Sequence, residues 1–122
     1  MGRFLMRRVA TGVKFDLKAA NGETIATSEV YKTEAACRKG MESVCRNGGK
    51  AGLEDQTEPD GPVLPNPKFV LYQDRAGNYR FRLCARNGNI IAVSEAYQSK
   101  ASCLDGVESV KKNIISFENG EI

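Results

Sequence analysis

The 122-residue chain contains no histidine and no tryptophan. Without histidine it lacks the most common general base, and the side chain whose ordinary pKa lies nearest neutrality. No acid–base pair or activated nucleophile stands out among the remaining residues. We therefore expect a protein that is not an enzyme and that has no catalytic residues.

The cysteines form no C-x-x-C pair. Cys37, Cys45, Cys84 and Cys103 are scattered, so a zinc site would need all four thiolates brought together without help from histidine. We expect neither a metal nor a cofactor. Free cysteine usually packs as a small apolar residue, and disulfides are uncommon in the cytosol. Cys37 and Cys103 are therefore predicted to be buried thiols.

Long apolar runs are also missing. No stretch of eighteen apolar residues exists, and the first residues lack the apolar segment of a signal peptide. These absences favour a cytoplasmic protein with no membrane contact. The 18 basic and 15 acidic side chains give a net charge of +3, which is too small to indicate nucleic-acid binding by itself.

What the chain does contain is an internal repeat. Residues 15–47 align with residues 81–113 at a shift of 66, and 17 of the 33 positions are identical. All four prolines lie between the copies, in residues 58–67. We predict a single domain over 1–122, built of repeat 1 (3–57), a proline-rich linker (58–67) and repeat 2 (68–122).

Each repeat begins as strands and a hairpin. Asn21-Gly22 and Asn87-Gly88 follow runs that alternate apolar and polar residues, and Asn-Gly is the strongest signal for a two-residue type I′ turn. With a two-residue loop, Ile25, Ile91 and Val93 point away from the helices. The third strand of repeat 2 is then apolar on both faces. Either the register differs, or the second face of the sheet is partly covered.

A helix follows in each repeat. Thr33 and Ser99 stand at predicted N-cap positions. The apolar residues after Thr33 recur at helical spacing, and Gly40 and Gly106 lie beside that stripe, which indicates close packing. Residues 52–57 and 115–118 are predicted to be short strands.

Two motifs recur in both repeats, Ser-Glu-x-Tyr at residues 28–31 and 94–97 and Glu-Ser-Val at residues 42–44 and 108–110. They could line a site. We favour a structural role, with serine and tyrosine bonding to backbone at the junction of strand and helix.

The runs Tyr79-Arg80-Phe81-Arg82-Leu83, residues 94–101 and residues 106–111 resemble the YegP-like family of small prokaryotic proteins. The match spans nearly the whole chain twice. The resemblance implies an α+β fold in which two tandem β-β-β-α-β units form one antiparallel sheet. Both helices would lie on one face, and the final strands could be exchanged between units. It implies no activity, because the family has no established function.

Alternation along the strands predicts a contact face on the side of the sheet without helices, carrying basic residues, one tyrosine and three apolar residues. Its members are Lys14, Lys18, Tyr72, Arg80, Arg82, Arg86, Ile25, Ile91 and Val93. Exposed apolar residues beside charges favour a protein partner or self-association. The basic residues leave nucleic-acid or anion binding as the alternative. Asp16 interrupts the basic patch, and no aromatic pair stands ready for base stacking.

Overall fold

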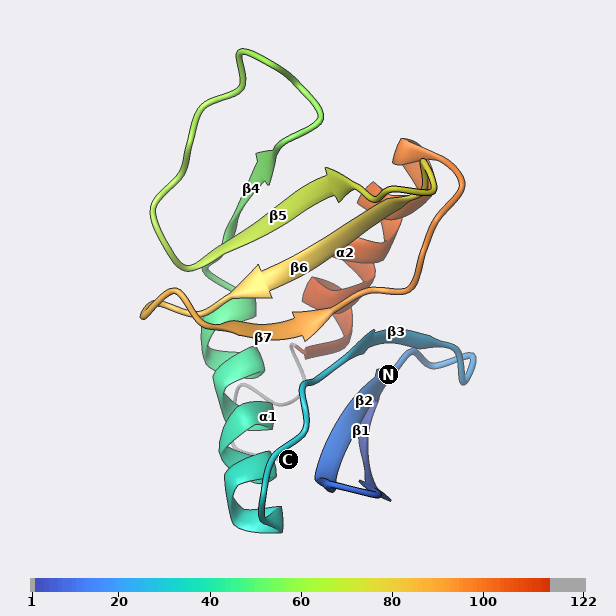
Figure 1. The fold of residues 1–122 in the computed structure, drawn as a ribbon, viewed down its shortest axis with the longest axis vertical. Helices are drawn as coiled ribbons and strands as arrows, with labels where there is room; N and C mark the ends of the chain where they lie inside the picture. The colour runs from blue at the N-terminus through green and yellow to red at the C-terminus, as the bar shows by residue number, and fades with distance from the viewer. Residues whose placement is uncertain (1, 115–122) are drawn as a thin grey trace.

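The structure is a computed structural model that describes residues 2–114 of the chain. Seven strands and two helices are found there: β1 (Arg3–Val9), β2 (Gly12–Lys18), β3 (Thr24–Thr27), α1 (Glu34–Gly48), β4 (Gly52–Asp55), β5 (Lys68–Gln73), β6 (Tyr79–Cys84), β7 (Ile90–Val93) and α2 (Lys100–Ile114). The fold is therefore α+β, as predicted (Figure 1). The strand expected at 115–118 lies outside the described residues. Neither of the two helices has the length and apolar character needed to cross a membrane.

The strands form one mixed sheet in the order β1-β2-β3-β7-β6-β5-β4. All neighbours pair antiparallel except β4 and β5, which are parallel, with Gly52 opposite Lys68 and Asp55 opposite Leu71. The prediction of a wholly antiparallel sheet is therefore wrong at this edge. The reason is the course of the chain: α1 contacts β5, β6 and β7, so the segment that leaves it reaches the edge of the repeat 2 strands.

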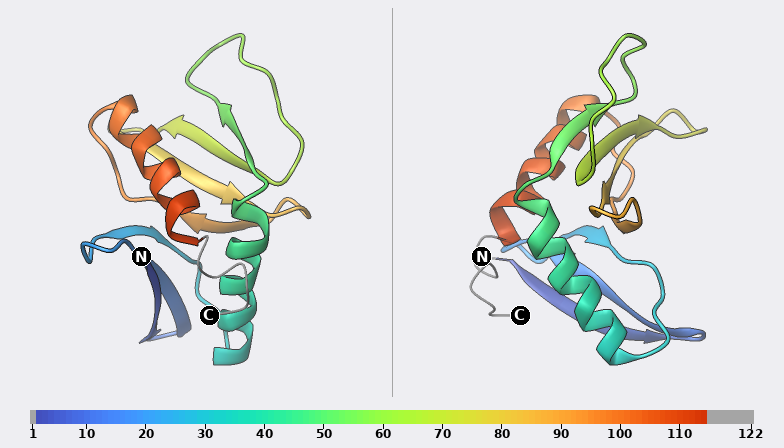
Figure 2. Two further views of the ribbon diagram at one scale, coloured as in Figure 1. Left: turned by 180° about the vertical axis from the view of Figure 1, so that it is seen from behind. Right: turned by 90° about the vertical axis from the view of Figure 1, so that its left-hand side faces the viewer.

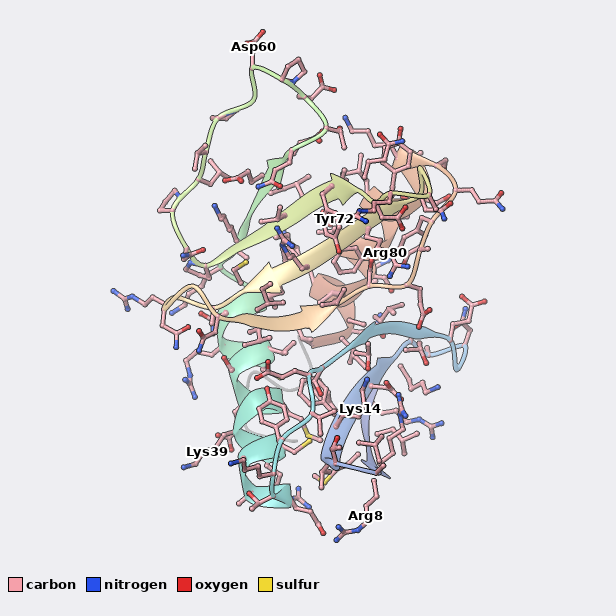
Figure 3. All side chains as sticks on the ribbon, in the orientation of Figure 1. Arg8, Lys14, Lys39, Asp60, Tyr72 and Arg80 are labelled. Carbon is pink, nitrogen blue, oxygen red and sulfur yellow. The ribbon has the colours of Figure 1, made fainter. Side chains whose placement is uncertain are left out.

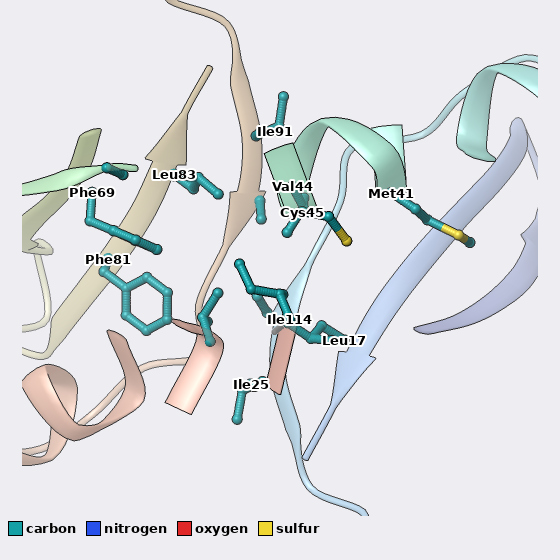
Figure 4. Close-up of a cluster of buried hydrophobic side chains, with 14 of the residues drawn as sticks. Leu17, Ile25, Met41, Val44, Cys45, Phe69, Phe81, Leu83, Ile91 and Ile114 are labelled. Atoms are coloured by element: carbon teal, nitrogen blue, oxygen red, sulfur yellow. The ribbon is translucent and has the colours of Figure 1, made fainter. Parts of the chain in front are cut away.

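The sheet consists of two halves that meet at a narrow seam. Strands β3 and β7 are joined through one residue pair, Thr27 and Val93 (Figure 1). Beneath the seam, apolar side chains from both halves and both helices form one buried cluster (Figure 4). Its members include Leu17, Ile25, Val44, Leu83, Ile91 and Ile114. The shared core therefore holds the halves together more than the strand pairing does.

The hairpins use three-residue loops in place of the predicted type I′ turns. The amide of Ala19 donates to the carbonyl of Glu23 over 2.8 Å, which leaves three residues in the loop. Among the described residues only glycines have positive φ, with Gly22 at 86° and Gly88 at 89°. A type I′ turn needs positive φ at both central residues, whereas a three-residue loop needs it at one. Asn21 stays in an ordinary conformation, and its Oδ1 accepts from the Glu23 amide.

A β-bulge after each of these hairpins corrects the predicted orientation of Ile25 and Ile91. Leu17 pairs with Ala26 but Lys18 pairs with Thr24, so Ile25 is an extra residue in its strand. A bulge re-aims side chains, and Ile25 is only 6% exposed, while Ile91 in the equivalent bulge is 7% exposed. Both isoleucines belong to the core, and their assignment to the contact face is wrong.

The helices begin where the sequence predicts. The hydroxyl of Thr33 accepts from the amide of Ala36, and the hydroxyl of Ser99 accepts from the amide of Ser102, each over 3.1 Å. Gly40 and Gly106 make close contact with the hydroxyl groups of Tyr31 and Tyr97, respectively, so a side chain would not fit at either position without movement.

Both helices pack on the same side of the sheet, as the two views of Figure 2 show. α1 contacts β2, β5, β6 and β7, while α2 contacts β3, β5 and β6. Each helix therefore reaches across the seam to strands of the other repeat. The opposite side of the sheet carries no helix within residues 2–114.

Candidate functional site: the open face of the sheet

We call the side of the sheet without helices the open face. Phe15 and Leu17 lie in the core, so the residues that alternate with them, including Lys14 and Lys18, point to the open face. The same alternation assigns side chains of β1, β5, β6 and β7 to it. These are Arg3, Leu5, Arg7, Tyr72, Arg80, Arg82 and Val93. Figure 3 shows Lys14 over β2, and Tyr72 and Arg80 over β5 and β6.

The contribution of β1 to this face was missed in the sequence reading. Phe4 and Met6 pack against the core, so Arg3, Leu5 and Arg7 lie on the other side of the strand. Leu5 is 44% exposed. Apolar and polar residues alternate along β1, which predicts a strand. Which set faces the core depends on the pairing of β1 with β2, and only the structure gives that register.

Asp16 does not interrupt the basic surface as an exposed charge, because it is only 6% exposed. Its Oδ2 lies 2.8 Å from Nε of Arg7, and its Oδ1 accepts a hydrogen bond of 2.7 Å from the hydroxyl of Thr27. Burial by itself would raise the pKa of Asp16, but the hydrogen bonds from Arg7 and Thr27 outweigh it and lower the pKa. Asp16 is therefore held as a carboxylate whose charge Arg7 already neutralises.

Arg80 is also paired. Its Nε lies 2.8 Å from Oδ2 of Asp74, at the start of the β5–β6 turn. Oδ1 of Asp74 accepts from the amides of Ala76 and Asn78, each over 3.0 Å. The hydrogen bond from Arg80 is the main reason that the pKa of Asp74 is lowered. This aspartate fixes the turn and holds the guanidinium over the strand.

The aromatic residue of the open face is covered by an arginine. The guanidinium carbon of Arg82 lies 4.7 Å from the centre of the Tyr72 ring, which is a cation–π contact. Tyr72 therefore does not offer a bare ring on which a nucleobase could stack. Arg82 makes no ion pair within residues 2–114.

Glu54 holds the proline-rich linker at the β4 edge of the sheet. The Oε1 atom of Glu54 accepts from Nζ of Lys68 and from the amide of Leu64, both over 2.7 Å, and Oε2 accepts from Gln56 over 2.8 Å. These bonds, the one from Lys68 first, lower the pKa of Glu54 to about 2. Glu54 therefore has a structural role, holding the linker against β4 and β5.

Arg86 does not lie on the open face, which corrects the prediction. It follows β6 and lines a groove with Arg46 and Lys50 near the end of α1. Its amide donates to Oδ1 of Asn47 over 3.2 Å. The amide of Ala85 donates to the carbonyl of Asn89, so Arg86 is the first residue of a three-residue loop, and period-two counting along β6 no longer applies to it.

The repeated Ser-Glu-x-Tyr motif is structural. The hydroxyl of Ser28 accepts from the amide of Phe15 over 2.9 Å and donates to the carbonyl of Glu29 over 2.7 Å. Ser94 makes the same two bonds, to Phe81 and Glu95, at the same distances. The serines thus join the second strand of each repeat to the segment that precedes its helix.

The thiols and acidic groups offer no metal centre in the described part of the chain, where no group of three or more potential ligands comes together. All four cysteines are buried, as predicted for Cys37 and Cys103. Burial raises the pKa of both thiols, that of Cys103 to about 11, so neither is a ready nucleophile at neutral pH.

The structure thus defines a class: a duplicated α+β protein with a helix layer on one side of its sheet and a cationic face on the other. A family model described as a domain of unknown function (DUF1508) matches the chain twice, at residues 10–55 and 74–116. The chain belongs to this family, which confirms the resemblance inferred from its sequence. The double match also agrees with the internal repeat.

Relatives and solved structures support this placement. The UPF0339 protein YegP of Yersinia pestis is 33% identical over 117 residues, covering 95% of this chain and 91% of the relative. A UPF0339 protein of Treponema denticola is 61% identical over 46 residues, which cover 38% of this chain and 79% of the relative. That relative therefore has about the length of one repeat.

A solution NMR structure of the protein of unknown function yegP from E. coli has a TM-score of 0.74 to this chain, at 30% identity. The similarity covers 93% of this chain and 86% of that chain. The solution NMR structure of a UPF0339 protein from Shewanella oneidensis has a TM-score of 0.73, also at 30% identity, and covers 93% and 84% of the two chains.

Proposed function

We propose that this protein is a non-catalytic interaction module that binds an acidic surface of a partner protein through the open face. The observation that carries the proposal is an unbalanced charge. The carboxylates that the strands place on this face, Asp16 and Glu54, are each already paired with a cation. Lys14 and Arg82 make no ion pair within residues 2–114 and are available to a partner.

An acidic protein suits this face better than a second copy of the chain. Two copies that met through the same surface would bring Lys14 and Arg82 against like charges, which is unfavourable. Exposed Leu5 and partly buried Val93 add apolar area beside the cations. Such a mixture is typical of protein interfaces.

Nucleic acid remains the alternative occupant. The cations would attract phosphates, but the ring of Tyr72 is already covered by Arg82. An exposed aromatic ring is the feature that single-strand binding platforms use. Backbone contact without stacking would make such binding weak and steeply dependent on salt.

A non-catalytic role is supported by the state of the acidic groups. The pKa values of Asp16, Glu54, Asp55 and Asp74 are all lowered, so these groups stay ionised at neutral pH and are poor proton donors there. The free thiols of Cys37, Cys84 and Cys103 support a cytoplasmic location, since disulfides are rare in reducing compartments. We further propose that the chain functions as two tandem units whose helices share one side, leaving the other side free for binding.

The test is fluorescence polarisation with a labelled poly-glutamate peptide and with labelled single-stranded RNA and DNA. Each probe is titrated at low salt and at about 200 mM salt. Wild type is compared with Lys14→Glu/Arg82→Glu on the open face. The control is Lys39→Glu, since Lys39 lies on the exposed surface of α1 (Figure 3).

We expect the peptide to bind wild type and the control alike, and to bind the open-face variant at least several-fold more weakly. Tighter binding of RNA or DNA than of the peptide, lost in the same variant, would establish the alternative. Equal loss in Lys39→Glu, or no binding of any probe at low salt, would rule out the open face as the contact surface.

A further inference from the structure

A second cationic feature lies apart from the open face, in the groove that contains Arg86. The groove has a volume of about 540 Å³, within the range of small-ligand sites. Three segments form it: the end of α1, the end of the linker, and the turn between β6 and β7. Its lining residues are Ser43, Arg46, Asn47, Lys50, Asn66, Pro67, Ala85, Arg86 and Asn87.

The charge of the groove is entirely positive. Arg46, Lys50 and Arg86 contribute three cations, and no acidic residue lines it. None of the three makes an ion pair with any residue that the structure describes. Side-chain amides and a serine hydroxyl supply further hydrogen-bond donors between the cations.

Helix electrostatics account for only one of these cations. Basic residues are favoured in the last turn of a helix, and Arg46 occupies that turn of α1. Lys111 and Lys112 occupy the last turn of α2 in the same way. Lys50 lies beyond the helix and Arg86 belongs to another segment, so the helix dipole does not explain them.

The duplication provides an internal comparison. At the shift of 66 residues, Ala20 corresponds to Arg86. The backbone around both positions is nearly the same, because each repeat has a three-residue loop that ends in a glycine with positive φ, Gly22 or Gly88. Since repeat 1 forms this loop with alanine, the fold does not need a cation at Arg86. The arginine is therefore free to serve a ligand.

The groove is also held in place. Asn47 is buried, and its Nδ2 donates to the carbonyl of Ser43 over 2.8 Å, while its Oδ1 accepts from the amide of Arg86. This side chain ties the end of α1 to the β6–β7 turn. The backbone that carries Arg46 and Arg86 is thus fixed before any ligand arrives, which lowers the entropic cost of binding.

We propose that this groove binds a phosphoryl group of a small anion, such as a diphosphate. Two guanidinium groups can donate paired hydrogen bonds to phosphoryl oxygens, and the lysine adds a point charge. Three cations match the multiple negative charge of a diphosphate better than the single charge of a carboxylate. The proposal is independent of the partner-binding role of the open face.

The test is an NMR titration of backbone amides, which is practical for a 13.3 kDa chain. The probes are inorganic pyrophosphate, a nucleoside diphosphate, and vesicles with and without an anionic phospholipid. We expect saturable shifts at Asn47, Lys50 and Asn87 with a Kd of about 1 mM or tighter for pyrophosphate. Tighter binding of the nucleotide points to a free nucleotide as the source, and binding only to anionic vesicles points to a lipid headgroup.

The variants Arg86→Ala and Lys50→Ser remove the two cations that helix electrostatics does not explain. We expect each to weaken pyrophosphate binding roughly tenfold, as for the loss of one charge-assisted bond. Lys112→Ala removes the counterpart of Arg46 on α2 and should have no effect. Spectral dispersion checks that each variant is folded.

Equal shifts around Lys112, or no saturable shift in the groove with any probe, would overturn the proposal. The open-face variant Lys14→Glu/Arg82→Glu separates the two sites. It should keep pyrophosphate binding in the groove, and equal loss there would assign the shifts to the open face.

Discussion

The two halves of the sheet carry different chemistry at the same point of the open face. In the repeat 1 half, Arg7 and Asp16 form an ion pair of 2.8 Å. Their counterparts, at shifts of 65 and 66 residues, are Tyr72 and Arg82, which form a cation–π contact of 4.7 Å. The third member changes as well, since Thr27 donates to Asp16 whereas its counterpart is Val93.

The residues beneath this face did not diverge in the same way. We call them the frame: Phe15, Ser28 and Tyr31 in repeat 1, and Phe81, Ser94 and Tyr97 in repeat 2. Ser28 and Ser94 make the same bonds, and the two tyrosines, Tyr31 and Tyr97, stack on the second-strand phenylalanines at the same centroid distance of 6.4 Å. Buried backbone donors and close ring contacts permit few substitutions. On the open face either cross-strand pair is compatible with the backbone, so the chemistry there was free to change.

The largest expected effects come from the frame phenylalanines. Phe15 packs edge-on against half-buried Phe4 at 5.4 Å, and Phe81 packs edge-on against fully buried Phe69 at 6.0 Å. Phe15→Ala and Phe81→Ala should each cost about 3–5 kcal/mol, the latter more, because its surroundings are less able to relax. Urea unfolding measures the difference. Should Phe81→Ala fail to fold, Phe81→Leu and Phe15→Leu give the same ranking, and a greater loss at Phe15 would contradict it.

Replacing the frame serines tests how alike the halves are. Ser28→Ala and Ser94→Ala each leave a buried amide, of Phe15 or Phe81, without its acceptor, at a cost of about 1–3 kcal/mol. Because the bonds are the same, we expect the two losses to agree within about 0.5 kcal/mol.

Ser43→Ala is the matched control for the serine variants. The Asn47 amide that bonds the Ser43 hydroxyl also bonds its carbonyl, so that donor keeps an acceptor and the loss should be smaller. Denaturant unfolding of the three variants decides the matter. A loss in only one of the two frame serines would mean that the halves differ below the surface as well.

The frame was also the part that sequence could predict. Local sequence patterns predict the N-caps at Thr33 and Ser99 and the buried thiols. Each pattern occurs in both repeats, which supports its interpretation. Ile25 and Ile91 were misplaced because an Asn-Gly pair is compatible with both two- and three-residue loops. The choice depends on φ at Asn21 and on a bulge that places both Ile25 and Ala26 in the core.

Predictions for the candidate site depended on long-range pairing and were less accurate. Alternation along the strands assigns Lys14, Arg80 and Arg82 to the open face, but it does not extend to Arg86, which lies in the loop after β6. The ion pair that buries Asp16 requires Arg7 from β1, whose register no local motif specifies. The parallel pairing of β4 follows from the span of α1 across the seam, which periodicity does not encode.

A smaller difference between the halves depends on pH. Glu54 holds the linker that follows repeat 1 through bonds from Leu64 and Lys68. Its pKa falls from the ordinary 4.5 to about 2 in the folded chain, mainly through the bond from Lys68. The carboxylate therefore stabilises the fold above pH 4.5, and this contribution is lost as the pH falls from 4.5 toward 2.

Thermal unfolding of wild type and Glu54→Gln over this range tests the clamp. Other carboxylates with lowered pKa values titrate in both proteins, so the quantity of interest is the difference in Tm. We expect the difference to be greatest above pH 4.5 and to shrink as the pH approaches 2. A difference that does not change with pH would mean that Glu54 acts through packing and not through its charge.

The smallest expected effect is on the open face itself. Tyr72→Leu removes the ring under Arg82 and should cost about 0.5–1 kcal/mol. Asp16→Asn breaks the ion pair with Arg7, and its cost in unfolding free energy should fall at high salt, whereas that of Tyr72→Leu should change little.

The transplant Tyr72→Arg/Arg82→Asp/Val93→Thr gives repeat 2 the chemistry of repeat 1. It should unfold within about 1 kcal/mol of wild type, because the repeat 1 frame already accepts these residues. It should nevertheless bind the acidic peptide more weakly, because it replaces the unpaired Arg82 with a carboxylate that would pair with the new arginine at position 72. If the transplant binds the peptide like wild type, Arg82 is not part of the contact surface. If it unfolds far more easily than wild type, the frame of repeat 2 does not accept the residues of repeat 1 on this face.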